Sequence, residues 1–583
     1  MTEADIKWNF TTNTDKHGRV YVITYYNRWD PEKKQSRIAK RMHVGRLDTD
    51  TGEITFSKRY LELFPQFLCK TMFYENNKLV ERSEEEIDKL KAAKTEHDFS
   101  FRCDSLSVGL TSACWTMALQ SGITAALEEV FGKDGLELLR LGIYELCSHG
   151  EAMQNYEDWL CMNYLPGAKQ LSSQQISDLL SKVNQEQIDQ YFKMRYDRIA
   201  GKYQSRIEES KKNAPTLNPM TIAIDSTSIA TYSESIGDAA FGHAKQDDFL
   251  KQINLTLCVD YETGDVCYGY ESEGSINDMA LFPELLMRML NCGIDLSNTL
   301  ITTDRGYSSI LNVQKQINCS LKFLTGVKIS EDSIKATIRK YRESLMNPIF
   351  MNGRLGVYAR TAPIEKWTST SEGMSIDHDV YVHLYHDPEL GAKQTRKFMT
   401  ELQTLLELKN NNHASEPSLW RSYSKFIEQN KNTKQWALKS SAVEKACRFN
   451  GYFVLRTNVV DDPFDALIIY RERNIVECAF RQFKVLNGGD RLRATATSFK
   501  GKLFIHMLAQ SLRMMMSVAA AHHKADGKIL PGDSLTKAML QLQKLQACRP
   551  AGRDSWITKE IPRKTRDLLD LFGVPYPQKH FKY

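Results

Sequence analysis

The chain has 583 residues, more than one hydrophobic core usually supports, and its hydrophobic content of 42% is enough to pack several domains. Its net charge of +5 is too small, over so large a surface, to indicate a partner by itself. The N-terminal stretch lacks the features of a signal peptide, and no run approaches the about 18 apolar residues of a membrane span. We therefore expect a soluble, multidomain, globular protein that is not secreted and has no membrane partner.

Several classes of function are excluded by the residues that are missing. The twelve cysteines are scattered singly, without a CxxC pair or a zinc-ribbon spacing, which is typical of reduced thiols in a cytoplasm. The sequence contains no GxxxxGK[ST], HExxH or GxSxG motif, which argues against an ATP-driven protein, a metalloprotease and an esterase.

The charge is unevenly distributed along the chain. From Tyr470 to Tyr583 there are 21 Lys and Arg against 9 Asp and Glu, an excess of 21 − 9 = 12, which suits a polyanion.

The first part of the chain changes from a strand-like to a helix-like pattern. Strand-like runs such as 19–25, and a turn signal at 48–52 before 53–56, predict a β-rich module in residues 1–100. This module ends in a charged stretch that is either a solvated helix or a linker. In residues 101–215 apolar residues recur every three or four positions, which predicts a helical domain.

An α/β pattern follows in residues 216–330. It contains strands at 221–225, 253–259, 266–270 and 299–303, with a helix at 277–290 before the last of them, capped by Asn277. The order is β-β-β-α-β. Residues 450–515 add a strand at 452–457 and a strong helix at 466–485. We therefore expect residues 331–449 to be an inserted domain that interrupts the core, and residues 516–583 to be a basic C-terminal region.

Two aspartates come directly after apolar strand residues. Asp225 follows Ile222-Ala223-Ile224, and Asp304 follows 300–303. Adjacent parallel strands would place both carboxylates at one sheet edge, where active sites form. Either aspartate alone could equally begin a turn. Two divalent ions held by clustered carboxylates can activate a nucleophilic oxygen and stabilise a leaving oxygen at a phosphodiester.

A third carboxylate is predicted on the helix at 466–485. With Tyr470 at zero and about 100° per residue, Arg473, Glu477 and Lys484 fall between about 300° and 340°. The apolar residues of the packing face fall between about 140° and 280°; they are Ile475, Val476, Ala479, Phe480 and Phe483. The rival Glu472, at about 200°, is predicted on that packing side. Arg473 and Glu477 could also form an ordinary surface ion pair.

These residues carry a resemblance to a known family. Tyr470, Arg473, Glu477 and Lys484 fit the pattern Y-x2-R-x3-E-x6-K of insertion-sequence transposases of the IS-four type. The stretches 224–228 and 303–307 also look like the two Asp motifs of that family, in the same order. The resemblance covers about Met220 to Arg513. It implies a ribonuclease-H-like catalytic core in which Asp225, Asp304 and Glu477 bind two Mg²⁺ or Mn²⁺ ions, while Tyr470, Arg473 and Lys484 contact DNA.

The implied function is a DDE transposase that cleaves transposon ends and joins them to target DNA by cut and paste. The resemblance does not decide whether this reaction passes through a hairpin intermediate. Its expected partners are double-stranded DNA and a second copy of the chain in a synaptic complex, in a bacterial cytoplasm beside the nucleoid. The helical domain and the basic tail are expected to help bind DNA. Two alternatives stay open: a metal-dependent nuclease without strand transfer, and an inactive DNA-binding protein derived from a transposase.

Weaker signals surround this set. Asp278 lies in a stretch, 274–278, that resembles a family loop near the site, but an acidic first-turn residue also suits a helix dipole, so we leave it out of the metal set. Eight basic residues are predicted to follow DNA phosphates: Lys500, Lys502, Arg513, Arg549, Arg553, Arg563, Lys564 and Arg566.

Overall fold

The structure is a computed structural model of the chain. It describes the chain except for residues 1–6, 16–18, 50–51, 69, 84, 90–102, 211–219, 243–248, 372–373, 431, 475–476, 479, 481–483, 485–490, 526, 528 and 551–553. The chain forms two compact units. Unit 1 comprises Met1–Asp104 with Cys548–Trp556, and unit 2 comprises Ser105–Ala547 with Ile557–Tyr583.

Unit 1 is built on a four-stranded antiparallel sheet in the order β1-β2-β3-β4. Its core is small and contains Val22, Val44, Ile54 and Tyr60. Tyr60 comes from α1, whose first turn is capped by the side chain of Ser57. The elements are β1 (Asn9–Thr14), β2 (Val20–Asp30), β3 (Gln35–Leu47), β4 (Ile54–Phe56), α1 (Lys58–Leu63), β5 (Met72–Glu75) and β6 (Lys78–Glu81).

Unit 2 contains a large mixed sheet in the order β10-β9-β8-β11-β12-β19-β16-β14-β13, in which β15 also pairs with β16 and β20 with β8. Its strands are β8 (Met220–Thr231), β9 (Lys251–Asp260), β10 (Val266–Glu273), β11 (Thr299–Thr303), β12 (Lys322–Val327), β13 (Met351–Asn352), β14 (Val357–Thr361), β15 (Glu365–Ser371), β16 (Met374–His386), β19 (Tyr452–Thr457) and β20 (Arg491–Leu492). Outside it lie β7 (Cys103–Ser107), β17 (Ile427–Gln429), β18 (Trp436–Leu438), β21 (Gln546–Pro550), β22 (Ser555–Thr558) and β23 (His580–Lys582).

The predicted β-β-β-α-β order is confirmed. β8, β9 and β10 pair antiparallel in sequence, and β11 then returns parallel to β8 with Thr303 opposite Ile224. The connecting helix α9 (Asp278–Asn291) is capped by Asn277, as predicted. A buried hydrogen bond from Thr302 to the Ile222 carbonyl, 3.0 Å long, ties β11 to β8. This mixed α/β arrangement is consistent with the expected ribonuclease-H-like core.

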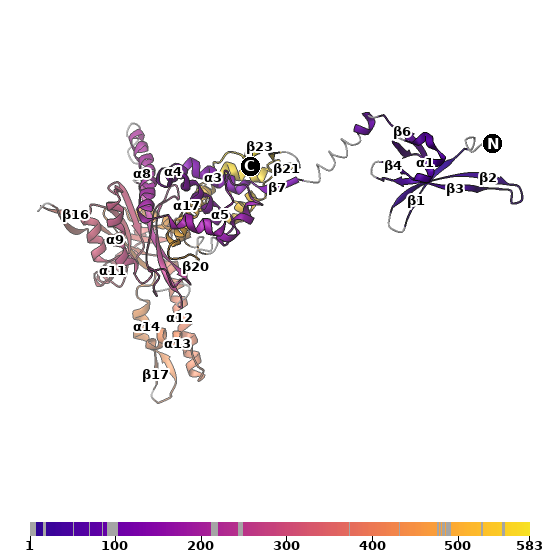
Figure 1. The fold of residues 1–583 in the computed structure, drawn as a ribbon. Coiled ribbons are helices and arrows are strands. Elements are labelled where there is room, and N and C mark those ends of the chain that lie inside the picture. Colours follow the sequence, from indigo (N-terminus) through magenta and orange to yellow (C-terminus); the bar gives the residue numbers. More distant parts are fainter. Residues whose placement is uncertain are drawn as a thin grey trace. The chain divides into compact units, whose positions relative to one another are not determined.

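Helices before and after the core share one hydrophobic cluster with its first three strands. They include α3 (Gly109–Ser121), α4 (Ile123–Phe131), α5 (Gly135–Cys147), α6 (Tyr156–Leu160), α7 (Ser173–Ser181), α8 (Gln185–Ser210) and α17 (Phe499–Ala525), and several can be followed beside the sheet in Figure 1. Arg195 of α8 and Ser511 of α17 both donate to the buried Asp265 between β9 and β10. The helical segment and α17 are therefore packed into the core rather than standing apart from it.

Helix α17 is the one described helix long and apolar enough to cross a membrane by length and composition. Of its most apolar window, 89% is buried inside the protein. Such burial is typical of a core helix, because a helix that is apolar all round must be covered by protein or by lipid.

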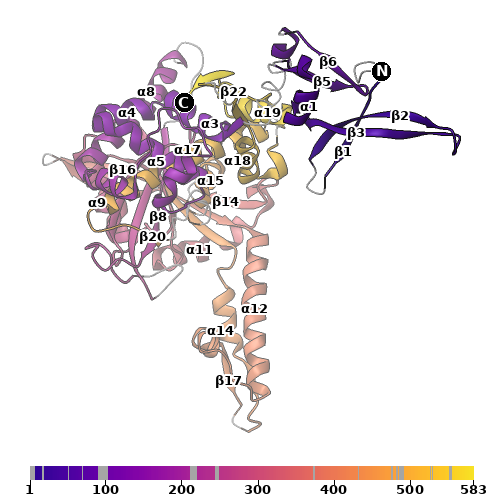
Figure 2. The ribbon, with the colours of Figure 1, turned by 45° about the vertical axis from the view of Figure 1, so that its right-hand side comes forward.

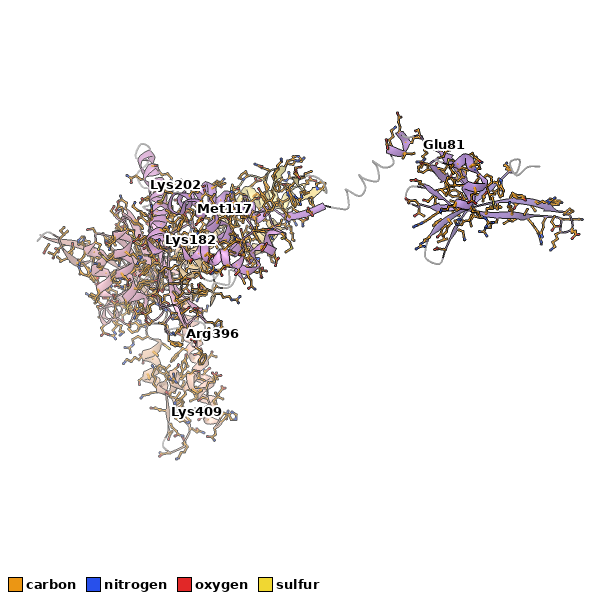
Figure 3. All side chains as sticks on the ribbon, viewed as in Figure 1. Glu81, Met117, Lys182, Lys202, Arg396 and Lys409 are labelled. Carbon is orange, nitrogen blue, oxygen red and sulfur yellow. The ribbon has the colours of Figure 1, made fainter. Side chains whose placement is uncertain are left out.

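The segment 331–449, which we expected to be an inserted domain, has two parts. β14 and β16 join the core sheet through β19, which pairs antiparallel with both β12 and β16. The rest of the segment forms a lobe around the long helix α12, which points away from the sheet (Figure 2). Figure 3 labels Arg396 and Lys409 along that helix. The lobe contains α12 (Pro388–Asn410), α13 (Pro417–Tyr423), α14 (Ser440–Cys447), β17 and β18. Sequence pattern alone missed the shared sheet because the pairing partners are about 70 residues apart.

Within the described residues, unit 2 also contains α10 (Ile310–Asn318), α11 (Asp332–Leu345), α15 (Pro463–Glu472), α18 (Leu535–Gln543) and α19 (Arg563–Leu571).

Candidate active site

Asp225 and Asp304 lie on neighbouring parallel strands, as predicted. Asp304 directly follows β11, and Asp225 directly follows Ile224, the β8 residue that pairs with Thr303. Adjacent strands are about 4.8 Å apart, so the register brings the two carboxylates to the same place. The prediction that Asp225 ends its strand was wrong. β8 continues to Thr231 because 226–231 pair with β9.

A third aspartate, Asp278, lies beside these two although we left it out of the metal set. Ser226, next to Asp225, donates a hydrogen bond from its hydroxyl to Asp278. The backbone N–H of Gly306 donates to the Asp304 carboxylate at 2.5 Å. A Cβ built at Gly306 would lie 2.7 Å from Asp304 Oδ1 and 3.4 Å from Asp278 Oδ2. Gly306 therefore leaves room for the carboxylates of Asp304 and Asp278 to approach one another. The helix dipole, which explained Asp278 in the sequence, gave no sign of this close approach.

The buried Tyr307 reports on the same cluster. Its ring is almost completely buried, and its hydroxyl has no hydrogen-bond partner within the described residues. Burial, together with the neighbouring carboxylates of Asp278 and Asp225, raises the pKa of Tyr307 well above its ordinary value. The phenol therefore stays neutral and can donate a hydrogen bond toward the acidic groups.

Arg473 connects Glu477 to the aspartates. Its guanidinium lies 3.8 Å from Asp225 and donates to Glu477, and its side chain is only 9% exposed. Burial lowers the pKa of Arg473, but the groups around it outweigh burial and raise that pKa above its ordinary value. Those groups are Tyr470, Glu477, Asp225 and Asp304. A cationic side chain is thus surrounded by the predicted carboxylates, whereas the helical wheel had placed it on an open face.

Tyr470 and Lys484 take different positions. The Tyr470 hydroxyl lies against Gly326 of β12, where a Cβ would come within 2.5 Å of it, and the Arg473 guanidinium lies 5.4 Å from the Tyr470 ring centre. Burial raises the pKa of Tyr470. Lys484, further along the chain, has a helical backbone conformation and is half-buried. Tyr470 is therefore linked to the carboxylates through its contact with Arg473.

The single helix predicted over 466–485 is interrupted at Arg473. α15 ends at Glu472, and the Arg473 N–H bonds to the Tyr470 carbonyl three residues back, at 3.2 Å, which tightens the last turn. Asn474, Glu477, Cys478, Phe480 and Lys484 are again helical. Phe480 is buried, as predicted for the packing face. The other packing residues, Ile475, Val476, Ala479 and Phe483, lie outside the described residues.

The rival carboxylate Glu472 was wrongly predicted to pack inward. It is exposed and lines a cavity of about 390 Å³ with residues of α17, including Met514 and Val518. Partial desolvation of its carboxyl group by the protein around it raises the pKa of Glu472. Glu477 shares Arg473 with Asp225, whereas no ion pair joins Glu472 to Arg473 within the described part of the chain. The turn at Arg473 separates the two glutamates.

The donor set fits a divalent metal ion by its chemistry. Carboxylate oxygens are the ligands that Mg²⁺ and Mn²⁺ prefer, and Asp225, Asp278 and Asp304 are joined through Ser226 and Gly306. As the side chains stand, the described part of the chain contains no group of three His, Cys, Asp or Glu residues placed to hold a metal ion. Glu477 is turned toward Arg473, so side-chain rotation would be needed to bring it to the same ion.

The predicted phosphate-binding basic residues are only partly accessible. Arg513 is fully buried in α17, Lys502 pairs with Glu145 at 2.6 Å, and Lys500 pairs with Glu271. For Arg513 and Lys502 the prediction was wrong, because both are buried in the core, whereas Lys500 is half-buried and its charge is paired with Glu271. Arg549 pairs with Asp104 at 2.7 Å, Arg553 lies outside the described residues, and Arg563, Lys564 and Arg566 of α19 are exposed.

Known proteins share features with this chain. A family model described as "Transposase DDE domain" matches residues 217–512, just over half of the chain and nearly the range of the resemblance noted from the motifs. No curated protein is similar enough to count as a match. A solved structure titled "Cryo-EM structure of piggyBac transposase synaptic complex with hairpin DNA (SNHP)" aligns over 74% of this chain and 78% of that chain, at 10% identity and a TM-score of 0.31.

Proposed function

Because this chain belongs to the family of transposases with a DDE domain, we propose that it cleaves DNA at transposon ends and transfers the freed strand into target DNA. The observation that carries the proposal is the parallel pairing of β8 with β11, which brings Asp225 and Asp304 together beside Arg473 and Glu477. The motif Y-x2-R-x3-E-x6-K supports placing the chain among transposases of the IS-four type.

DDE transposases generally use divalent metal ions. In this chain Asp225, Asp304 and Glu477 would hold two ions, Mg²⁺ or Mn²⁺, which activate the attacking oxygen and stabilise the leaving oxygen. Arg473 is held within reach of the same carboxylates, so it can donate to a phosphate that enters the site and hold the strand in line. The Tyr470 ring supports the guanidinium through a cation–π contact, and Lys484 adds a second positive charge further along the chain.

The proposed partners are those that the family resemblance implies. The substrate is double-stranded DNA at two transposon ends and a target, and a homodimer would hold both ends in one synaptic complex. We place the reaction in a bacterial cytoplasm, beside the nucleoid. The residues that hold the phosphate do not distinguish a pathway with a hairpin from one without. The sizes of the DNA intermediates would distinguish them.

The function is tested by its metal requirement. Purified protein is incubated with labelled duplexes carrying the ends of its element and an unlabelled target, with Mg²⁺ or with EDTA, and the products are separated on a denaturing gel. We expect cleavage at the end and a longer, joined product with Mg²⁺, and neither product with EDTA, because the carboxylates alone cannot neutralise the charge that develops at the phosphorus.

The alternatives give different products in the same assay. Metal-dependent cleavage without the longer product would identify a nuclease and refute strand transfer. Binding of the duplex without cleavage in either Mg²⁺ or Mn²⁺ would identify an inactive DNA-binding protein and refute the catalytic proposal altogether.

Asp278 is expected to support the same reaction. Asn at this position keeps an acceptor for the Ser226 hydroxyl but removes one negative charge beside Asp304, so we expect Asp278→Asn to slow cleavage by about tenfold to a hundredfold. A Mg²⁺ titration should show that part of the loss is recovered at high metal concentration. Glu273→Gln, an exposed change at the end of β10, is the matched control. Cleavage by Asp278→Asn within about twofold of wild type would remove Asp278 from the site.

A further inference from the structure

The β2–β3 hairpin of unit 1 extends beyond the sheet to which it belongs. β1 pairs with β2 no further than Tyr25, and β4 pairs with β3 only from Gly45 onward. Beyond these points, within the described residues, the two strands pair only with each other. Figures 1 and 2 both show β2 and β3 continuing as a two-stranded ribbon. We call residues 27–41, the outer part of this ribbon, the arm.

The arm is strongly basic. It contains two acidic residues, Asp30 and Glu32, against six basic ones, Arg28, Lys33, Lys34, Arg37, Lys40 and Arg41. Arg28 lies directly opposite Arg37 in the ladder, so two like charges share one face of the ribbon. Such cross-strand pairs destabilise a sheet. Asp30 lies 3.9 Å from Arg37 and offsets part of this repulsion, but the arm still has an excess of 6 − 2 = 4 positive charges.

The other face of the arm is apolar and uncovered. Trp29 pairs with Ser36 and Ile38 pairs with Asn27, so both large side chains lie on the face opposite the two arginines. Trp29 is 62% exposed and Ile38 is 57% exposed. A two-stranded ribbon without a covered face is marginally stable in water. Both faces of the arm are therefore exposed and accessible to another molecule.

We propose that the arm inserts into a groove of double-stranded DNA. The charge selects a polyanion, and the shape selects a duplex, because a two-stranded ribbon fits the major groove, which is about 12 Å wide. Arg28 and Arg37 would face the phosphates, and Trp29 and Ile38 would contact sugars and base edges such as the thymine methyl group. The inference rests on the proposed function in one respect only: that function supplies duplex DNA as the partner.

The test measures binding without catalysis. Full-length protein is titrated into a short fluorescein-labelled duplex in EDTA over a series of KCl concentrations, and affinity is read from fluorescence anisotropy. We expect Arg28→Ala with Arg37→Ala to weaken binding by about tenfold or more and to reduce the slope of log affinity against log salt by about two. Trp29→Ala should weaken binding at every salt concentration without changing the slope, because it removes no charge.

A control variant, Lys393→Ala with Arg396→Ala, removes the same charge from exposed positions of α12 in unit 2. Retained affinity in this control supports the arm, whereas an equal loss would reduce the effect to net charge and overturn the proposal. Unchanged duplex binding by the arginine variant would also overturn it. Binding to phosphatidylserine vesicles is measured in parallel. If the arginine variant lost binding to vesicles but not to the duplex, the arm would bind a membrane surface and the proposal would be overturned. Because EDTA prevents cleavage, failure of the proposed catalysis leaves this result readable on its own.

Discussion

Replacing Asp304 by Asn is expected to reduce cleavage of transposon-end DNA by about a thousandfold or more, which corresponds to ~4 kcal/mol of lost transition-state stabilisation. Asn can still accept the hydrogen bond that the Gly306 N–H donates at 2.5 Å, so the turn after β11 should keep its shape. The carboxylate charge that would hold a metal ion is removed. The initial rate of end cleavage in Mg²⁺, compared with wild type, measures the effect.

The matched control for this change is Asp295→Asn. Asp295 precedes β11 at the opposite end of the strand, is exposed, and accepts from the Ser297 N–H at 2.9 Å. We expect the control to cleave at the wild-type rate and both variants to melt within a few degrees of wild type. Wild-type cleavage by Asp304→Asn in a folded protein would show that the metal is held elsewhere.

Glu477→Gln should abolish cleavage to a similar degree, while Glu472→Gln should cleave normally. The two glutamates are five residues apart, but only Glu477 accepts from Arg473, which also lies 3.8 Å from Asp225. A glutamine in place of Glu477 keeps an acceptor for Arg473 and loses the charge needed beside a metal ion, so about a thousandfold loss is expected. Glu472 faces the cavity beside α17 instead.

The same cleavage assay separates the two glutamates. Binding of the end duplex in EDTA serves as the second readout, and both variants should bind as wild type does, since neither change removes a positive charge. If Glu472→Gln abolished cleavage and Glu477→Gln did not, the third carboxylate would be Glu472, and the match to the family pattern at Glu477 would be a coincidence.

Much of the catalytic core was predictable because its signals are local. The strands at 253–259, 266–270, 299–303 and 452–457 are apolar runs between turn residues, and the structure contains each of them. Asn277 caps α9 because a side-chain acceptor at that position bonds to a backbone N–H three residues later. Asp304 could be recognised in the same way, since it follows directly after a strand of five buried residues.

Other parts of the site depend on contacts between distant residues. Asp278 looks like an ordinary first-turn acid, and only the hydrogen bond from Ser226, 52 residues earlier, places it beside the other aspartates. The helical wheel assumed one continuous helix through Glu477, whereas α15 ends at Glu472 and the Arg473 guanidinium lies 3.8 Å from Asp225. Periodicity reports which side of a helix is apolar, and it cannot report where a helix stops when no Gly or Pro marks the end.

The sequence by itself determined the order of the core elements, the two aspartates that follow apolar strand residues and the Y-x2-R-x3-E-x6-K pattern, since all three are written in short stretches of the chain. Only the tertiary structure decided that β14 and β16 extend the core sheet, that Lys502 and Arg513 are buried, and that Arg473 lies among the carboxylates. The physical reason is range. Hydrogen bonding and side-chain alternation within a few residues leave a periodic trace in the sequence, whereas strand pairing and ion pairs between distant residues leave none.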